Sequence, residues 1–233
     1  MNKVTSISVF LSLMVYLNST SYCDLLLPEH SLEEEGHLAY YTAKDFSYLI
    51  GMEGFSKEAL EMHFKLYEGY VKNTNLLLKI LYDYVKENKE ETPQFGAIKQ
   101  RLAFELDGMR LHELYFSNLG GKEEIDRNTS LYKQIIKDFG TFETWKQNFI
   151  NTGMIRGIGW VILYLDPVNK QLINMWISEH QENHLVGGIP ILIMDVWEHA
   201  YMIDYGLNRM NYINAFWNKI NWSIVSSRYD KSF

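Results

Sequence analysis

Apolar residues in the first half of the chain recur at steps of three, four and seven, which is the spacing of an amphipathic helix. The pattern predicts one long helix from Ser56 to about Asn88. Ser56 is the expected N-cap, because its hydroxyl can accept a hydrogen bond from the free N–H groups of the first turn. The apolar face of this helix holds Leu60, His63, Tyr67, Tyr70, Leu77 and Ile80.

A second helix is predicted from about Ala97 to Asn118, where the glycines of LGG end it. The charged segment KENKEETPQFG, which contains Pro93 and Gly96, is expected to link the two helices. Together they predict an N-terminal helical hairpin.

After Gly121 the pattern changes. NTSLYKQIIKDFG and TFETWKQNFINTG are typical of short helices, each ended by a glycine. GWVILYLD, QLINMWIS and IPILIMD are strand candidates, with DPVNK as the turn between the first two. NYINAFWNKINWSIVSSRY predicts one aromatic C-terminal helix. This order indicates an α+β protein: a helical hairpin domain over residues 24–119, then an α/β domain over residues 120–233 with a small antiparallel sheet of about three strands.

The first 23 residues have the plan of a secretory signal peptide: Lys3, an apolar core from Val4 to Leu17, and then small residues from Ser19 to Ser21. The segment is too short, and too polar at its end, for a membrane span. We therefore expect residues 1–23 to be removed and the mature chain to be secreted or periplasmic. The alternative is an apolar N-terminal helix on a cytoplasmic protein. The single cysteine, Cys23, lies at the junction, so no disulfide is expected in the mature chain.

Composition narrows the class of partner. Apolar residues make up 47% of the 233 residues and charged residues 22%, as in an ordinary soluble globular protein. The net charge of −7 does not suggest a nucleic-acid partner. The aromatic content of 15% supplies large amphipathic rings, which often line polar sites.

The stretch DVWEHAY, residues 195–201, places Asp195 and His199 four residues apart in apolar and aromatic surroundings. On a helix, residues at this spacing face the same way and can bind one ion together. His63, His112 and His180 also lie in apolar contexts. One such histidine is usually a hydrogen-bonded core residue, but several of them with a buried carboxylate indicate a cation. Three imidazoles and one carboxylate suit Fe, Mn, Zn, Co or Cu, and not Ca²⁺ or Mg²⁺.

Two kinds of metal enzyme are excluded by motif. The chain has no H-E-x-x-H, the zinc protease motif. Di-iron bundles use Glu-x-x-His pairs, whereas Leu60, Met109 and Val196 stand three residues before the candidate histidines.

DVWEHAYMIDY followed by FWNKINW resembles the signature region of the iron/manganese superoxide dismutases. LEMHFKLYEGYVKNTN and LHELYFSNL resemble the helices of the family's first and second metal ligands, and FGTFETWKQNF and GIGWVILYL resemble its middle segments. The resemblance covers nearly all of the chain after about Phe55. It implies that His63, His112, Asp195 and His199 bind one Fe or Mn ion per subunit, with water or hydroxide as a fifth ligand.

The resemblance further implies that superoxide is the substrate and is disproportionated to O₂ and H₂O₂. The reaction consumes two protons, so a proton relay is needed. Tyr70 is the candidate, but it lies seven residues after His63 where the family usually has eight, and Tyr67 is the alternative. Trp160 and Trp197 are expected to form a dry shell around the metal.

The choice of metal depends on the group beside the metal's solvent ligand. Many iron members supply a glutamine four residues before the second histidine, where this chain has Gly108. The group is then expected from the strand region, as His180 or Gln181. Successive strand residues face opposite sides, so only one can point at the metal. The fifteen residues from His180 to Asp195 resemble members that use histidine, which favours His180, and with it iron or dual-metal use.

The family relationship also implies a homodimer formed through Glu198, His199 and Tyr201, with Glu198 reaching across to a ligand histidine of the partner subunit. Arg209 matches a family arginine near the substrate funnel, although Met210 stands where the family usually has proline. Two alternatives to a dismutase stay open. One is a degenerate secreted member that only binds metal or only assembles. The other is a zinc hydrolase using the same ligands, for which no general base is evident.

Overall fold

The computed structural model describes residues 40–122 and 124–232, all within one compact unit, Glu35–Phe233. The predicted signal peptide, residues 1–23, lies outside the described residues. In the described part of the chain, no helix combines the length and apolar composition needed to cross a membrane.

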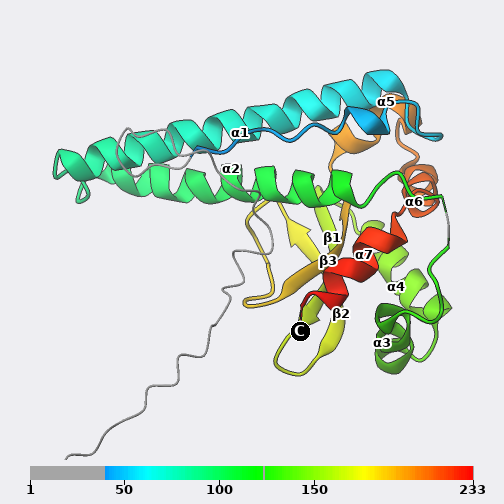
Figure 1. Cartoon of the computed structure of the whole chain (residues 1–233). Coiled ribbons are helices and arrows are strands. Elements are labelled where there is room, and N and C mark those ends of the chain that lie inside the picture. The colour runs from blue at the N-terminus through cyan, green and yellow to red at the C-terminus, as the bar shows by residue number, and fades with distance from the viewer. Residues whose placement is uncertain (1–39, 123, 233) are drawn as a thin grey trace, which may run out of the picture. The chain divides into compact units, whose positions relative to one another are not determined.

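Two long helices, α1 (Lys57–Lys86) and α2 (Pro93–Ser117), pack along each other as the predicted hairpin (Figure 1). Ser56 caps α1 as expected, its side chain accepting a hydrogen bond from the backbone N–H of Ala59 at 3.0 Å. A short 3-10 helix, η1 (Ser47–Leu49), precedes the hairpin.

Helix α2 begins four residues earlier than the predicted start at Ala97, so the linker is shorter than expected. The hydroxyl of Thr92 accepts a hydrogen bond from the N–H of Phe95 at 3.3 Å and caps the helix. Pro93 then occupies the first turn, where its fixed φ suits a helix and its missing N–H costs nothing. The proline marks the beginning of the helix and not part of the linker.

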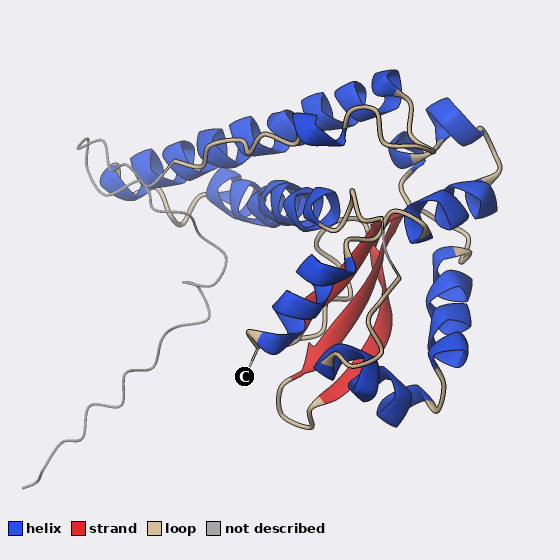
Figure 2. Cartoon of the chain, turned by 45° about the vertical axis from the view of Figure 1, so that its right-hand side comes forward, coloured by secondary structure: helices blue, strands red, loops and turns tan. Residues whose placement is uncertain are grey.

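The three predicted strands form with the expected bounds, as β1 (Gly159–Asp166), β2 (Gln171–Ser178) and β3 (Ile189–Asp195). They form one antiparallel sheet (Figure 2). The order of the strands is β2-β1-β3. All of β1 but its last residue is buried, which explains its unbroken apolar sequence. The predicted class, a helical hairpin followed by an α/β domain with a small antiparallel sheet, is confirmed.

Helices complete the α/β domain. They are α3 (Ser130–Phe139), α4 (Phe142–Gly153), η2 (Glu198–Ala200), α5 (Met202–Tyr205), α6 (Arg209–Trp217) and α7 (Trp222–Asp230). The prediction of a single C-terminal helix was wrong, because the chain breaks between α6 and α7. At the break the backbone N–H of Asn221 donates to the carbonyl of Asn118 at 2.5 Å, while the side chain of Asn221 caps α7. A tertiary contact therefore interrupts the helical pattern.

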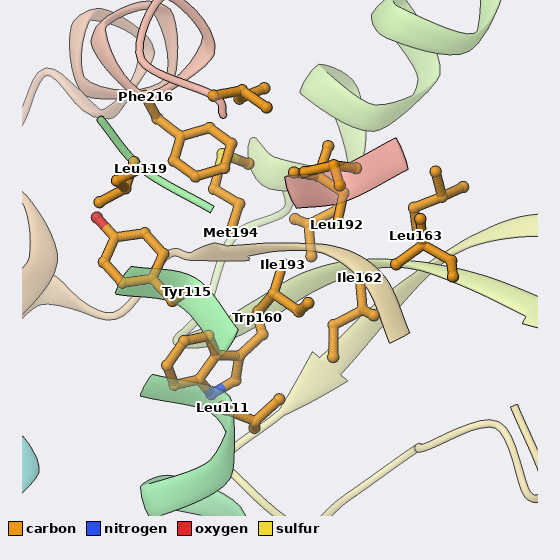
Figure 3. Packing of buried hydrophobic residues seen from close by; sticks show 14 of the residues in the cluster. Leu111, Tyr115, Leu119, Trp160, Ile162, Leu163, Leu192, Ile193, Met194 and Phe216 are labelled. Carbon is orange, nitrogen blue, oxygen red and sulfur yellow. The ribbon is translucent and has the colours of Figure 1, made fainter. Parts of the chain in front are cut away.

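The core joins α2 to the sheet (Figure 3). Leu111 and Tyr115 from α2 lie against Trp160 of β1 and Ile193 of β3, all of them buried. Tyr115 also stacks on Phe216 of α6, with ring centroids 5.9 Å apart. This packing fixes the second half of α2 against the ends of β1 and β3, where the candidate site lies.

Candidate metal centre

Four elements bring His63, His112, Asp195 and His199 together. His63 lies on α1, His112 on α2, Asp195 at the end of β3 and His199 in η2. One nitrogen or oxygen atom from each lies within 4.8 Å of the other three. The Oδ2 atom of Asp195 is 3.2 Å from the Nε2 atoms of His63 and His199, and 3.7 Å from that of His112.

The helix predicted to carry both Asp195 and His199 does not form. Asp195 is the last residue of β3 and pairs with Trp160 of β1, and His199 follows in a 3-10 turn. The Asp195 side chain stabilises the turn itself, because its Oδ1 accepts a hydrogen bond from the N–H of Trp197 at 2.8 Å. The two side chains thus meet across a strand-to-turn corner.

Three of the four residues of the centre are buried, and burial acts on the pKa of each of them. His63, His112 and Asp195 are at most 5% exposed. Burial lowers the pKa of His63, and holds the pKa of His112 well below its usual range. Burial alone would raise the pKa of Asp195, but the neighbouring His199 and His63 hold it well below its usual range. An ionised carboxylate therefore lies beside buried neutral imidazoles.

These residues fit a transition-metal ion. The Nε2 atoms of His63 and His112 are buried and have no hydrogen-bond partner, which is costly unless a cation accepts their lone pairs. The other ring nitrogen of His112, Nδ1, donates to the carbonyl of Gly108 at 2.6 Å. This bond fixes the tautomer in which Nε2 faces the centre with a free lone pair. Nitrogen and carboxylate donors of this kind suit Fe or Mn.

His180 lies beside this centre, but in a turn after β2 and not in a strand as expected. The turn begins at Glu179, whose φ is 52°. The His180 ring is buried, whereas Gln181 is partly exposed and its Oε1 accepts a hydrogen bond from the N–H of His180 at 3.3 Å. The strand alternation that was expected to turn only one of the two residues toward the metal therefore does not apply. It is the His180 ring that lies among the buried aromatic rings of the site.

Hydrogen bonds define the tautomer of His180. The indole N–H of Trp160 can only donate, and it lies 3.1 Å from His180 Nδ1. The proton of the neutral ring is therefore on Nε2, from which it donates to the Tyr70 hydroxyl at 2.7 Å. Burial lowers the pKa of His180 to about 4, so the ring is neutral at pH 7. Burial also raises the pKa of Tyr70, which keeps its proton and can donate it elsewhere.

Tyr70, and not Tyr67, lies against the centre. The Tyr70 ring stacks on His112, with centroids 5.1 Å apart. The Tyr67 hydroxyl instead donates to Glu113 at 3.1 Å and accepts from the N–H of Lys44 at 2.9 Å.

Comparison with known proteins agrees with this geometry. Residues 52–120 match the family model described as "Iron/manganese superoxide dismutases, alpha-hairpin domain", and residues 127–228 match the model for the C-terminal domain of the same enzymes. The chain belongs to the iron/manganese superoxide dismutase family. It is accordingly an oxidoreductase that converts superoxide to O₂ and H₂O₂, with one Fe or Mn ion per subunit. The predicted alternative of an inactive member is not favoured.

Individual relatives include both metal types. A "Superoxide dismutase [Fe]" of Methanothermobacter marburgensis is 35% identical over 182 residues, covering 76% of this chain and 89% of that protein. One from Aquifex pyrophilus is 33% identical over 210 residues, covering 87% and 93%. A "Superoxide dismutase [Mn]" of Haloarcula marismortui is 38% identical over 125 residues, covering 54% and 61%.

The structure also places the other residues that the family resemblance predicts. Trp160 packs edge-on against His112, at 5.0 Å between centroids, and Trp197 stacks on His180 at 4.7 Å. Arg209 is the first residue of α6, and its side chain contacts the loop after α4. It donates to the carbonyls of Ile155 at 2.8 Å and Gly157 at 2.7 Å, and also to the Tyr201 hydroxyl at 3.2 Å. Glu198 is exposed on the surface of the chain.

Two further contacts to the site were not predicted from the sequence. The Tyr212 hydroxyl donates to the backbone carbonyl of Asp195 at 2.6 Å. His184 contacts the carbonyl of His180 at 2.7 Å. The four-residue spacing of the two histidines in HQENH was a usable signal for the second contact. Tyr212 is one of many aromatic residues in its segment, so no local pattern distinguishes it as a partner of Asp195.

Proposed function

We propose that His63, His112, Asp195 and His199 are the ligands of the dismutase metal. The observation that supports this most directly is the pair of buried, unpartnered Nε2 atoms that face the Asp195 carboxylate. When bound, the ion supplies one-electron chemistry by alternating between its +3 and +2 states. Three neutral imidazoles and one carboxylate leave net positive charge on a divalent or trivalent ion, which favours the approach of a small anion such as superoxide.

Tyr70 is the proposed proton donor, held by His180. Two superoxide ions and two protons give one O₂ and one H₂O₂, so a donor near the centre is required. His180 Nε2–H occupies the acceptor position of the Tyr70 hydroxyl, which leaves the hydroxyl hydrogen to point elsewhere. The surrounding indoles of Trp160 and Trp197 exclude water and keep the donor oriented.

The ligand set is tested with His63→Ala and Asp195→Ala, with Asp83→Ala, at a partly exposed position of α1 away from the centre, as a control. Both site variants should lose the metal on dialysis, as measured by elemental analysis, and should lose superoxide removal with it. The control should keep both. Full metal content in either site variant would show that the ligand set is wrong.

Iron or dual-metal use is the proposed preference, and it follows from the placement of His180 rather than Gln181 among the site rings. The test is to load the wild type, His180→Ala and Gln181→Ala separately with Fe and with Mn. We expect the iron form of the wild type to be active and His180→Ala to be the impaired variant. Activity of the manganese form alone, or impairment of Gln181→Ala alone, would contradict the proposal.

We also propose a homodimer through Glu198, His199 and Tyr201. Glu198 is exposed, and beside it Met202 and Ile203 are 42% and 41% exposed, which gives this surface an apolar character. Glu198→Ala should weaken the dimer in analytical ultracentrifugation at micromolar concentration. A wild-type protein that sediments only as a monomer would refute the dimer.

The proposed location is outside the cytoplasm, and it rests on the basic, apolar and small-residue order of residues 1–23. Fusion of these residues to a reporter enzyme should export the reporter, and Lys3→Glu with a charged residue in the apolar core should retain it. Cytoplasmic retention of the unaltered fusion would favour the alternative of a cytoplasmic protein.

A further inference from the structure

A second group of polar side chains surrounds His184, which contacts the backbone of His180 instead of its ring. His184 Nε2 lies 2.7 Å from the carbonyl oxygen of His180, and His184 Nδ1 lies 2.7 Å from the Tyr164 hydroxyl. Asp107 Oδ2 is 4.0 Å from the same Nε2 atom. The group therefore joins α2, β1 and the turn that carries His180.

The chemistry of the partners defines each role in this group. A carbonyl oxygen can only accept, so His184 Nε2 carries the hydrogen. In the neutral ring Nδ1 is then an acceptor, and the Tyr164 hydroxyl must donate to it. Burial raises the pKa of Tyr164, so its hydroxyl keeps the hydrogen that this bond needs. His184 is thus held in one tautomer, with its donor directed at His180.

The turn needs such support because its backbone is unfavourable. Glu179 has φ of 52°, in the left-handed region that residues with a Cβ rarely adopt, and Asn183 has φ of 66°, which an asparagine tolerates better than most residues. These two residues flank His180 and precede His184. A side-chain bond from His184 back to His180 closes the turn and offsets its strain.

The same group connects the turn to α2, the helix that carries His112. Asp107 directly precedes Gly108, whose carbonyl accepts from His112 Nδ1. Tyr70 lies on α1, which packs along α2, so a shift of the turn relative to the hairpin would change the 2.7 Å distance between His180 Nε2 and the Tyr70 hydroxyl.

We propose that His184 is a positioning residue of the dismutase site, which holds His180 through its backbone carbonyl and thereby sets the contact between His180 and the Tyr70 hydroxyl. The inference rests on the proposed function of Tyr70 as proton donor. His184 contacts neither the ligand group nor Tyr70 by hydrogen bond, so its effect is indirect.

The test uses His184→Leu, which cannot donate, and His184→Gln, whose amide can donate to the carbonyl and accept from Tyr164. Glu182→Ala, exposed in the same turn, is the matched control. The first measurement is nitrogen-15 NMR of the histidine side chains in the zinc-loaded full chain, which is diamagnetic and needs no dismutase activity. We expect His180 to show a single Nε2–H tautomer in the wild type, the control and His184→Gln, and a mixture in His184→Leu.

The second measurement is superoxide removal by the iron-loaded variants at equal metal content, followed against pH. His184→Leu should remove superoxide about tenfold more slowly than the wild type, and the alkaline limit of its pH profile should shift. His184→Gln should recover most of the lost activity. A single His180 tautomer and an unshifted profile in His184→Leu would overturn the inference. So would a glutamine variant as impaired as the leucine variant. If the wild type removes no superoxide, the proposed function fails, while the NMR measurement still decides whether His184 positions His180.

Discussion

Gly108 shows how one missing side chain shapes the site. A Cβ atom placed there would lie 2.8 Å from Cδ1 of Tyr70 and 3.1 Å from Cδ2 of His180. Those two rings approach the helix as closely as they do because α2 presents only backbone at this position. The space that a side chain would fill from α2 is taken by His180 from the turn after β2.

Gly108→Ala should therefore impair the site although alanine favours helices. We expect at least a tenfold loss of superoxide removal at equal metal content. Unfolding free energy should fall by about 1–3 kcal/mol from overpacking. The control is Gly96→Ala in the same helix, where a Cβ meets nothing within 4 Å, and which should gain about 0.5–1 kcal/mol with unchanged activity. Equal effects of the two substitutions in urea unfolding and in activity would contradict this assignment.

The buried ring of His180 should also make stability depend on pH. Its pKa falls from 6.5 to about 4 on folding, so between these values the unfolded chain binds more protons than the folded one. Unfolding free energy should then rise with pH through this window, and fall by up to about 3 kcal/mol as the pH drops from 6.5 to 4. His180→Gln, which does not titrate, should lack that part of the slope. Urea unfolding at several pH values measures the slope of unfolding free energy against pH for the wild type and for His180→Gln. Equal slopes for the two proteins would refute the effect.

At the scale of elements, the local pattern of apolar and polar residues was enough to predict the bounds of a segment wherever burial of that segment's own side chains stabilises it. The bounds of β1 and β3 follow from nearly unbroken apolar runs, and those of β2 from a mainly apolar segment that begins after a turn. The local pattern failed to predict the bounds of a helix where a single capping side chain or a distant segment determines them. Thr92 and Pro93 begin α2 within what looked like a linker. The break before α7 depends on a backbone bond to Asn118, about a hundred residues away, which no local pattern reveals.

Arg228 of α7 illustrates such a distant contact. Its guanidinium donates to the carbonyls of Leu114 on α2 at 2.9 Å and Ile191 on β3 at 3.1 Å, and also to the Asn118 and Ser117 side chains. Arg228→Met keeps the length but leaves these acceptors without a donor, so we expect a loss of about 3 kcal/mol in unfolding free energy. Arg127→Met, at an exposed position, should change it by less than about 0.5 kcal/mol. Similar denaturation midpoints for the two variants would show that Arg228 does not join these elements.

At the scale of the whole molecule, the candidate site is an assembly of distant segments. The four ligand residues were predicted from the family resemblance, because the D-x-W-E-H-A-Y motif and two histidine-bearing helices occur in a specific order along the chain. Their mutual distances, the tautomers of His180 and His184 and the corner at Asp195 follow only from the packing of α2 on the sheet. The four-residue spacing of Asp195 and His199 suggested a helix at that corner. A strand end followed by a 3-10 turn can bring two side chains together at the same spacing, so the spacing alone does not distinguish the two structures.

Removal of the metal should lower the stability of the whole chain. A ligand that binds only the folded state at 100 to 1,000 times its Kd adds about 3–4 kcal/mol. Treatment with a chelator should therefore lower the thermal midpoint by several degrees, and added Fe or Mn should restore it. Asp195→Ala should show the low midpoint with or without metal. A wild-type midpoint that does not respond to chelation would mean that metal binding and folding are not linked.

The order in which the four proposed ligands occur along the chain has a consequence for biosynthesis. His63 and His112 belong to the hairpin, while Asp195 and His199 come near the end of the polypeptide. A nascent chain can offer the hairpin pair early, but the full set exists only after translation is nearly complete and the sheet has packed on α2. If the full set selects the metal, the ion concentrations in the compartment where the finished chain folds would influence whether iron or manganese is captured.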